Sequence, residues 1–213
     1  MSLPLVSKSG SFTTSFNLSP ILTNSSATLS NRFYTYNTAT GTNGDYEAVF
    51  PTQNEGTYSF EAGKGYLIRT PDTHPAYVEG NPGTAINAEF AGVPYNQSVN
   101  VALSNANTGF NLVGNPYPSA INVVTLFDNS NLGTLYFWTH NSAISSNVFT
   151  SDDYAIRTRT TGTAAVTGGT APGIYVAAGQ AFFASAGTTT TINFTNAMRV
   201  AGNNAQFYRE AQD

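Results

Sequence analysis

Hydrophobic and polar residues alternate with a period of two along much of the chain. Residues 99–103 read Val-Asn-Val-Ala-Leu, and the same alternation recurs at 86–90 and 192–195. This is the pattern of half-buried strands. Continuous apolar runs at 66–68 and 174–176 are more typical of central strands. The pattern predicts a chain built from strands.

Turn-forming residues interrupt these segments at short intervals. They lie at 42–44, 81–83, 107–109, 168–169 and 172–173, and each cluster contains Gly. Short strands at such spacing predict an all-β fold, antiparallel and sandwich-like, although a barrel would give the same signals.

A helical period is nearly absent from the sequence. Only residues 119–129 fit one, with Ile121, Val124 and Leu126 roughly on one face. This segment predicts one short helical turn.

Short segments recur in the same order in the two halves of the chain. Residues 16–18 match 110–112, 34–36 match 136–138, 62–66 match 178–182, and 86–87 match 192–193. Four matches in order predict a tandem duplication with loop insertions. We place a first β-domain at 1–92 and a second at 93–213. The repeat leaves open whether these halves are separate or form one compact body.

Composition excludes several classes of partner and site. The net charge is −4 and only 9% of the residues are charged, and the basic residues are scattered. We therefore expect no nucleic-acid partner. No apolar run approaches the length of a membrane-spanning helix, so we expect no membrane insertion. Cysteine is absent, which excludes disulfides and thiolate metal sites.

Catalytic machinery is sparse. The two histidines are His74 and His140, and no Gly-x-Ser-x-Gly elbow is present. Asp45 and Glu47 would share one face of a strand, as a glycosidase pair requires, but isolated carboxylates at this spacing are usually solvated. We predict that the chain is not an enzyme and keep a hydrolase as the weakest hypothesis.

Calcium is the one cofactor that the sequence leaves open. Its ligands would be oxygens from two polar segments, formed by Asp128, Asn129, Asn131, Asp152 and Asp153. Neither segment has the spacing of an EF-hand, and the competing interpretation is a pair of polar turns.

Aromatic residues suggest a ligand surface. If Leu135 and Phe137 face the core, Tyr136 and Trp138 face the other way; Tyr34 and Tyr36 hold the equivalent positions in the first half. Exposed Tyr and Trp rings stack on sugars and hydrogen-bond through their polar groups. The competing interpretation, which we favour, is that this second face packs against the other half or another sheet.

One segment carries a family resemblance. Residues 111–119 read Asn-Leu-Val-Gly-Asn-Pro-Tyr-Pro-Ser, which resembles a motif of large secreted surface proteins of Bacteroidetes, where it commonly precedes a type IX secretion sorting domain. The family usually has Trp where this chain has Phe110. The resemblance continues through Ile121 and through residues 135–138, 172–173, 178–183 and 192–196.

The resemblance implies a place rather than an activity. It implies a protein at the cell surface of a Gram-negative bacterium or outside the cell, with the neighbouring domains of a larger surface protein as partners. We therefore expect a non-catalytic accessory or structural module, with adhesion as a further role. The alternative is a carbohydrate-binding module with polysaccharide as its partner.

The motif itself also predicts local structure. Two prolines in Asn115-Pro116-Tyr117-Pro118 force an extended and then turning backbone. We expect the Asn115 side chain to bond the backbone two residues on and take Tyr117–Pro118 as a candidate cis peptide. We interpret the segment as a fold-defining corner, with a ligand site as the alternative.

Overall fold

The computed structural model describes residues 2, 5–6, 16–17, 33–49, 61–69, 89–90, 93–142, 144, 149–204 and 208. Within them lie seventeen strands, two short 3-10 turns and one α-helix, α2 (Val123–Ser130). Every pairing between these strands is antiparallel. The protein is therefore all-β, as the alternation predicts.

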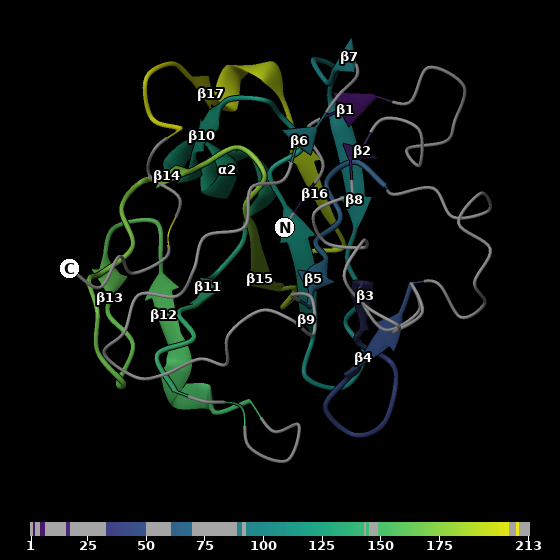
Figure 1. Cartoon of the computed structure of the whole chain (residues 1–213), viewed down its shortest axis with the longest axis vertical. Coiled ribbons are helices and arrows are strands. Elements are labelled where there is room, and N and C mark those ends of the chain that lie inside the picture. The colour runs from purple at the N-terminus through teal and green to yellow at the C-terminus, as the bar shows by residue number, and fades with distance from the viewer. Residues whose placement is uncertain are drawn as a thin grey trace.

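The largest sheet has five strands and comes wholly from the second half. In spatial order these are β13 (Gly162–Thr163), β12 (Tyr154–Arg157), β11 (Leu135–Trp138), β15 (Ala181–Ser185) and β9 (Phe110–Gly114). Two hairpin connections and one long return along the chain build this order (Figure 1).

Smaller sheets surround the five-stranded sheet. One joins β14 (Tyr175–Val176), β10 (Ala120–Asn122) and β17 (Arg199–Val200), and another joins β4 (Asp45–Ala48), β3 (Phe33–Asn37) and β5 (Leu67–Ile68). Three pairs complete the described strands: β16 (Thr191–Phe194) with β8 (Val99–Ala102), β1 (Leu5–Val6) with β7 (Val93–Pro94), and β2 (Phe16–Asn17) with β6 (Glu89–Phe90).

Two predicted alternating segments are confirmed and one is only partly visible. In β16 the burial alternates between exposed and buried, and in β8 between half-buried and exposed. Residues 86–88 and the turn at 81–83 lie outside the described residues.

The continuous apolar runs do not mark central strands. In the described part of the chain, β5 and β14 each stand at the edge of a three-stranded sheet. Each run contains one fully buried residue, Tyr66 in the first and Val176 in the second. Ile174, at the start of the second run, is exposed.

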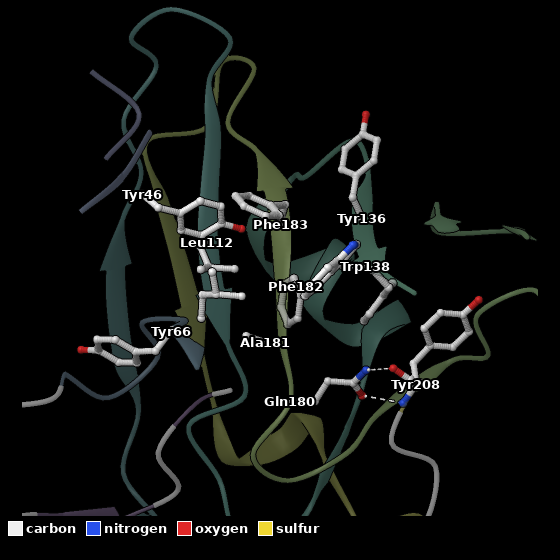
Figure 2. Close-up of a pocket in the computed structure, with 12 residues that line it drawn as sticks. Tyr46, Tyr66, Leu112, Tyr136, Trp138, Gln180, Ala181, Phe182, Phe183 and Tyr208 are labelled. Atoms are coloured by element: carbon white, nitrogen blue, oxygen red, sulfur yellow. Dashed lines mark hydrogen bonds between the residues drawn. The ribbon is translucent and has the colours of Figure 1, made fainter. Parts of the chain in front are cut away.

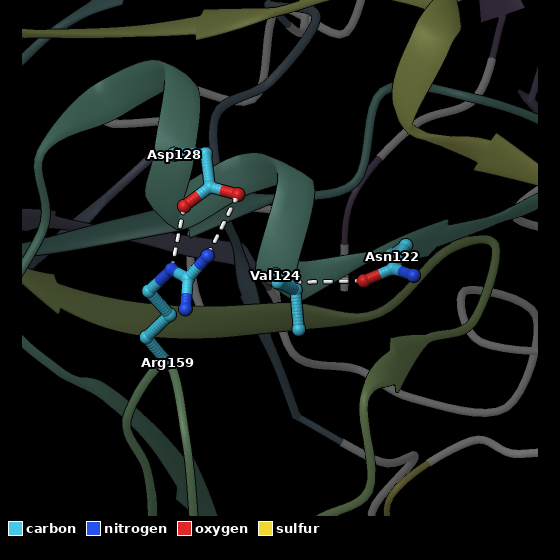
Figure 3. Close-up of polar contacts among 4 residues, drawn as sticks. All are labelled: Asn122, Val124, Asp128 and Arg159. Carbon is cyan, nitrogen blue, oxygen red and sulfur yellow. Dashed lines mark hydrogen bonds and ion pairs between the residues drawn. The ribbon is translucent and has the colours of Figure 1, made fainter.

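Helix α2 packs against β16 and β10 and shares one buried core with Leu135 and Phe137 of the five-stranded sheet. The side chain of Asn122 caps the first turn by accepting a hydrogen bond from the Val124 amide at 2.8 Å (Figure 3), which satisfies a backbone donor that the helix leaves unpaired. Leu126 and Phe127 are buried. The helix starts later than predicted, because Ile121 belongs to β10. It has eight residues rather than a single turn. Val124, which was predicted on its apolar face, is only half-buried.

The two halves are joined along β9. The Gly65 amide donates to the Leu112 carbonyl at 3.0 Å, and the Gly114 amide donates to the Gly63 carbonyl at 2.9 Å. Lys64 forms an antiparallel bridge with Val113. Residues on both sides of position 92 therefore share one hydrogen-bonding pattern, and Figure 1 shows β5 beside β9. The division at 92 and the sandwich arrangement stay predictions.

The sheet around β3 reproduces the pairing around β11. Tyr34 pairs with Leu67 as Tyr136 pairs with Phe183. The sequence repeat aligns the two tyrosines, and Leu67 and Phe183 directly follow its aligned segments 62–66 and 178–182. In the neighbouring hairpins, Tyr36 pairs with Tyr46, and Trp138 pairs with Tyr154.

A glycine with the same backbone conformation lies shortly before β5 and shortly before β15. Gly63 and Gly179, which the repeat aligns, both have positive φ, 81° and 77°, in the region that glycine tolerates best. The correspondence ends at the first repeated segment, because β2 pairs with β6 whereas β9 pairs with β15. The duplication stays a prediction, and the common register supports it.

Candidate functional site: an aromatic face and a hollow between the halves

The face of the five-stranded sheet opposite α2 is lined with aromatic rings. Register places Tyr136 beside Phe183 and Trp138 beside Tyr154, and Phe110 at the end of β9 packs edge-on against Tyr136 at 5.2 Å between ring centroids. We call these five side chains the aromatic face. Leu135 and Phe137, which alternate with Tyr136 and Trp138, are 0% and 3% exposed, so the predicted division of β11 into a core side and a second side is confirmed.

Phe183 is the centre of this face. Its ring makes edge contacts with Tyr36 at 4.9 Å, Tyr154 at 6.0 Å and Tyr46 at 6.4 Å. Tyr36 and Tyr46 come from β3 and β4, so aromatic rings of the first half cover the centre of the face. Edge-to-face pairs of this kind are favourable beyond the apolar area that they bury.

Trp138 remains half-exposed at the other side of the face. Its indole stacks on His140 at 4.5 Å and meets Phe149 edge-on at 5.3 Å, and Phe149 in turn contacts Tyr46 at 5.4 Å. Phe149 therefore links the tryptophan of the second half to a tyrosine of the first.

A hollow of about 160 Å³ lies between these rings. Its walls include Tyr46 and Leu67 from the first half, and Tyr136, Trp138 and Ala181 from the second. In Figure 2, Tyr46 and Trp138 lie on opposite sides of Phe183. No charged side chain is among the described residues that line it.

The tyrosines beside the hollow are neutral. Burial raises the pKa of Tyr154 to about 12, and it raises the pKa of Tyr46 further, with the neighbouring Tyr154 adding to the effect. The pKa of Tyr36 is raised by burial and by the charge of Asp45. A low-dielectric environment disfavours the phenolate, so these side chains hold their protons at neutral pH.

Gln180 and Tyr208 line the hollow as a reciprocal pair (Figure 2). The Gln180 amide donates to the Tyr208 carbonyl and accepts from the Tyr208 amide, both at 3.1 Å. Gln180 is 3% exposed. Its polar atoms are engaged by the backbone of the C-terminal segment.

The four predicted aromatic ligands are placed differently. All four are half-buried, and of the four only Tyr136 and Trp138 line the hollow. Tyr36 donates its hydroxyl to the Asn43 carbonyl at 2.6 Å and packs on Phe183, and Tyr34 pairs with Leu67 in β5. Ligand binding by any of them stays a prediction.

Sequence reasoning missed Tyr46, Phe149, Tyr154 and Phe183. Tyr46 and Tyr154 were within reach, because each follows its hairpin turn at the position opposite an aromatic residue of the repeat. Phe149 lies in a segment with no alternation, so only the folded chain brings it to Trp138.

The first proposed calcium segment is engaged in other contacts. Asp128 forms an exposed two-bond ion pair with Arg159, at 2.5 and 3.2 Å (Figure 3), and this guanidinium lowers the pKa of the Asp128 carboxyl. Asn131 ends α2 in the left-handed conformation, and Asn129 is exposed.

The second segment is a hydrogen-bonded loop. The buried Asp153 carboxylate accepts from the Ser142 amide and hydroxyl and from the Thr167 hydroxyl, while Asp152 is exposed. The described residues contain no group of three or more acidic or histidine side chains placed to hold a metal. Calcium binding stays a prediction for both segments.

The other described catalytic candidates lie on β4 and just after β11. Asp45 and Glu47 lie on one face of β4 and are exposed, and Glu47 accepts hydrogen bonds from Asn37 and Thr40 at 2.8 Å. His140 has positive φ, 56°, beside Trp138. His74 lies outside the described residues.

The Asn115 motif forms a buried corner. The Asn115 amide donates to the carbonyls of Ser119, Val176 and Ala177 at 2.8 to 3.2 Å. Its oxygen accepts from the Tyr117 amide at 2.9 Å, which confirms the predicted bond two residues on. The cis prediction for Tyr117–Pro118 is wrong, because every described peptide bond is trans.

Comparison with protein families gives one match, which covers residues 9–213. The chain belongs to the family described as a domain of unknown function, DUF8693. Neither the curated proteins nor the solved structures contain a match. Among the described residues, no helix has the length and apolar character to cross a membrane. The family has no assigned activity, so a function rests on the geometry of the chain itself.

Proposed function

We propose that this member of DUF8693 is a non-catalytic accessory module of a secreted surface protein, which holds and presents neighbouring domains. The observation that carries the proposal is the use of the aromatic face. Tyr36 and Tyr46 of the first half pack on Phe183 of the second, so much of this face serves to join the halves. Such a junction suits a rigid spacer.

The distribution of charge supports the same function. The described carboxylates that could act in hydrolysis are exposed, ion-paired or saturated by hydrogen bonds. The proposal also includes a location at the surface of a Gram-negative cell or outside it, with adhesion as a further role. The support for this location is the resemblance of residues 111–119 to surface proteins of Bacteroidetes.

A carbohydrate-binding module is the second candidate. Half-exposed Tyr136 and Trp138 beside the hollow favour it, because such rings stack on sugar faces. In this candidate polysaccharide is the partner, and the calcium segments remain to be tested with it.

A pull-down separates the two candidates. The purified chain is incubated with insoluble polysaccharides, with and without calcium, and the supernatant is also assayed for released sugar. The spacer function on its own predicts no saturable binding and no product. Saturable binding to one polymer would favour the carbohydrate module, and released product would contradict both.

The spacer function has its own positive test in the parent protein. Deletion of residues 9–213 is expected to leave the catalytic or binding activity of the neighbouring domains unchanged in solution. It is expected to reduce their accessibility to protease or antibody on intact cells. Unchanged accessibility would contradict the spacer function.

A further inference from the structure

We infer that the hollow between the halves is a binding site for one uncharged sugar ring, held between Trp138 and the Tyr46 side of the first half. This inference deepens the carbohydrate-binding candidate and rests on it. It replaces the duplicated aromatic platform with a single site to which both halves contribute.

The size of the hollow sets the size of the ligand. A volume of about 160 Å³ corresponds to about five water molecules at their liquid volume of about 30 Å³ each. A space of this size matches a single hexopyranose ring better than a stacked chain of rings. A polysaccharide would therefore contribute one residue, either its end or a side branch.

The walls set the chemistry of the ligand. Tyr46, Tyr136 and Trp138 present ring surfaces, which suit the apolar C–H faces of a sugar. The indole N–H of Trp138 supplies a neutral hydrogen-bond donor, whereas the Tyr46 hydroxyl is hydrogen-bonded to Tyr154.

The absence of charge among the described lining residues selects against acidic sugars. A carboxylate placed between these walls would lose water without gaining a cationic partner, which is costly. A neutral hexose keeps its hydroxyls at the open edge and buries only its apolar face. Neutral glycosides are therefore the expected ligands and uronic acids are not.

The two halves do not offer equivalent sites. Tyr36 holds in the first half the position of Trp138, but its ring packs on both Phe183 and Tyr46 and its hydroxyl is bonded to Asn43. Trp138 packs on His140 and Phe149, but of these two equivalent residues it is the one that lines the hollow. One ligand per chain is therefore expected, whereas a duplicated platform would bind two.

The first test uses the unmodified chain. Methyl glucopyranoside, galactopyranoside and mannopyranoside are titrated while Trp138 fluorescence and the ¹³C-methyl spectrum of the alanines are recorded. We expect one-to-one binding of at least one of them in the millimolar range, with the Ala181 methyl among the shifted signals. The matching methyl glucuronide is expected to bind at least tenfold more weakly.

A filling variant tests the location. Ala181→Leu extends a side chain into the hollow without removing an aromatic ring, and it is expected to weaken binding at least tenfold. Ala197→Leu, at an exposed position of the 3-10 turn Asn196–Met198, is the matched control and should bind within twofold of the unmodified chain. Thermal unfolding and near-ultraviolet circular dichroism verify that both variants fold.

Two outcomes would overturn the inference, and they differ in what they leave standing. In the first outcome, polysaccharide binding needs Trp138, but monosaccharides do not compete with it and Ala181→Leu does not reduce it. That result would overturn the hollow as the binding site and retain the aromatic platform. No binding of any monosaccharide or polymer would overturn both and leave the spacer. If Ala181→Leu does not fold, an unshifted Ala181 methyl at saturating glycoside is the contradicting result.

Discussion

At the scale of single residues, Asn115 shows how one buried amide fixes a corner of the fold. Its side chain uses both donor hydrogens and its oxygen on four backbone groups, of which the Ala177 carbonyl also accepts from the backbone amide of Gln180. The residue is 0% exposed, so water cannot replace these bonds. The motif that carries the family resemblance is, in this structure, a hydrogen-bonded junction between β9, β10 and β14.

Replacement of Asn115 is therefore expected to be costly. Asn115→Ala leaves buried carbonyls without donors and should lower the free energy of unfolding by about 2–4 kcal/mol. Asn115→Asp places an anion against those carbonyls and should be worse at pH 7 than at pH 4, where the acid regains a donor. Urea denaturation at both pH values measures this, with the exposed Asn193→Ala as a control that should stay within about 0.5 kcal/mol. Equal effects at positions 115 and 193 would contradict the buried corner.

At the scale of elements, the segment before β5 joins the halves through a close backbone approach. A Cβ on Gly65 would lie 2.7 Å from Leu112 Cγ, 2.9 Å from the Val113 carbonyl oxygen and 3.1 Å from Ala181 Cβ. Only glycine lets the backbone come this near to β9. The bond from Gly65 to Leu112 depends on that approach.

Gly65→Ala should consequently separate this segment from β9. We expect a loss of about 1–3 kcal/mol in stability, because overpacking shifts backbone against backbone. Gly133→Ala is the matched control, since a Cβ there meets nothing within 4 Å, and it should be neutral or slightly stabilising. Thermal unfolding of both variants decides, and indistinguishable midpoints would show that the junction at Gly65 is not tight.

At the scale of the whole molecule, buried tyrosines make stability depend on alkaline pH. Burial raises the pKa of Tyr117 and Tyr154 to about 12, and it raises the pKa of Tyr46 and Tyr36 as well. The unfolded chain ionises its tyrosines near pH 10. Below pH 10 both states keep the protons and the stability is complete.

Between pH 10 and 12 the unfolded chain loses protons that the folded chain retains, so stability falls with rising pH. Each such tyrosine contributes up to about 1.4 kcal/mol per pH unit to the slope. Guanidinium denaturation at pH 8 to 12 measures it, with tyrosinate absorbance followed in parallel. Tyr117→Phe should reduce the slope, and a stability that is flat between pH 10 and 12 would contradict the buried tyrosines.

Period-two alternation and turn residues determined the all-β class, because the direction of successive side chains in a strand is set locally. The same local rule placed Tyr136 and Trp138 on the face opposite Leu135 and Phe137. The bond from Tyr117 to Asn115 was also predictable, since it spans two residues.

Tertiary structure decided what covers that face. Alternation is the same for a face in solvent and for a face that packs against another part of the chain. Phe149, from a segment without alternation, contacts Trp138, and Tyr46, from a segment remote in sequence, contacts Phe149. The edge positions of β5 and β14, the ion pair of Asp128 with Arg159 and the hollow likewise depend on long-range contacts. Sequence determined the class of fold and the kinds of residue in the walls. The packing of the two halves determined that a hollow of about 160 Å³ remains between them, because that packing depends on contacts between residues far apart in the chain.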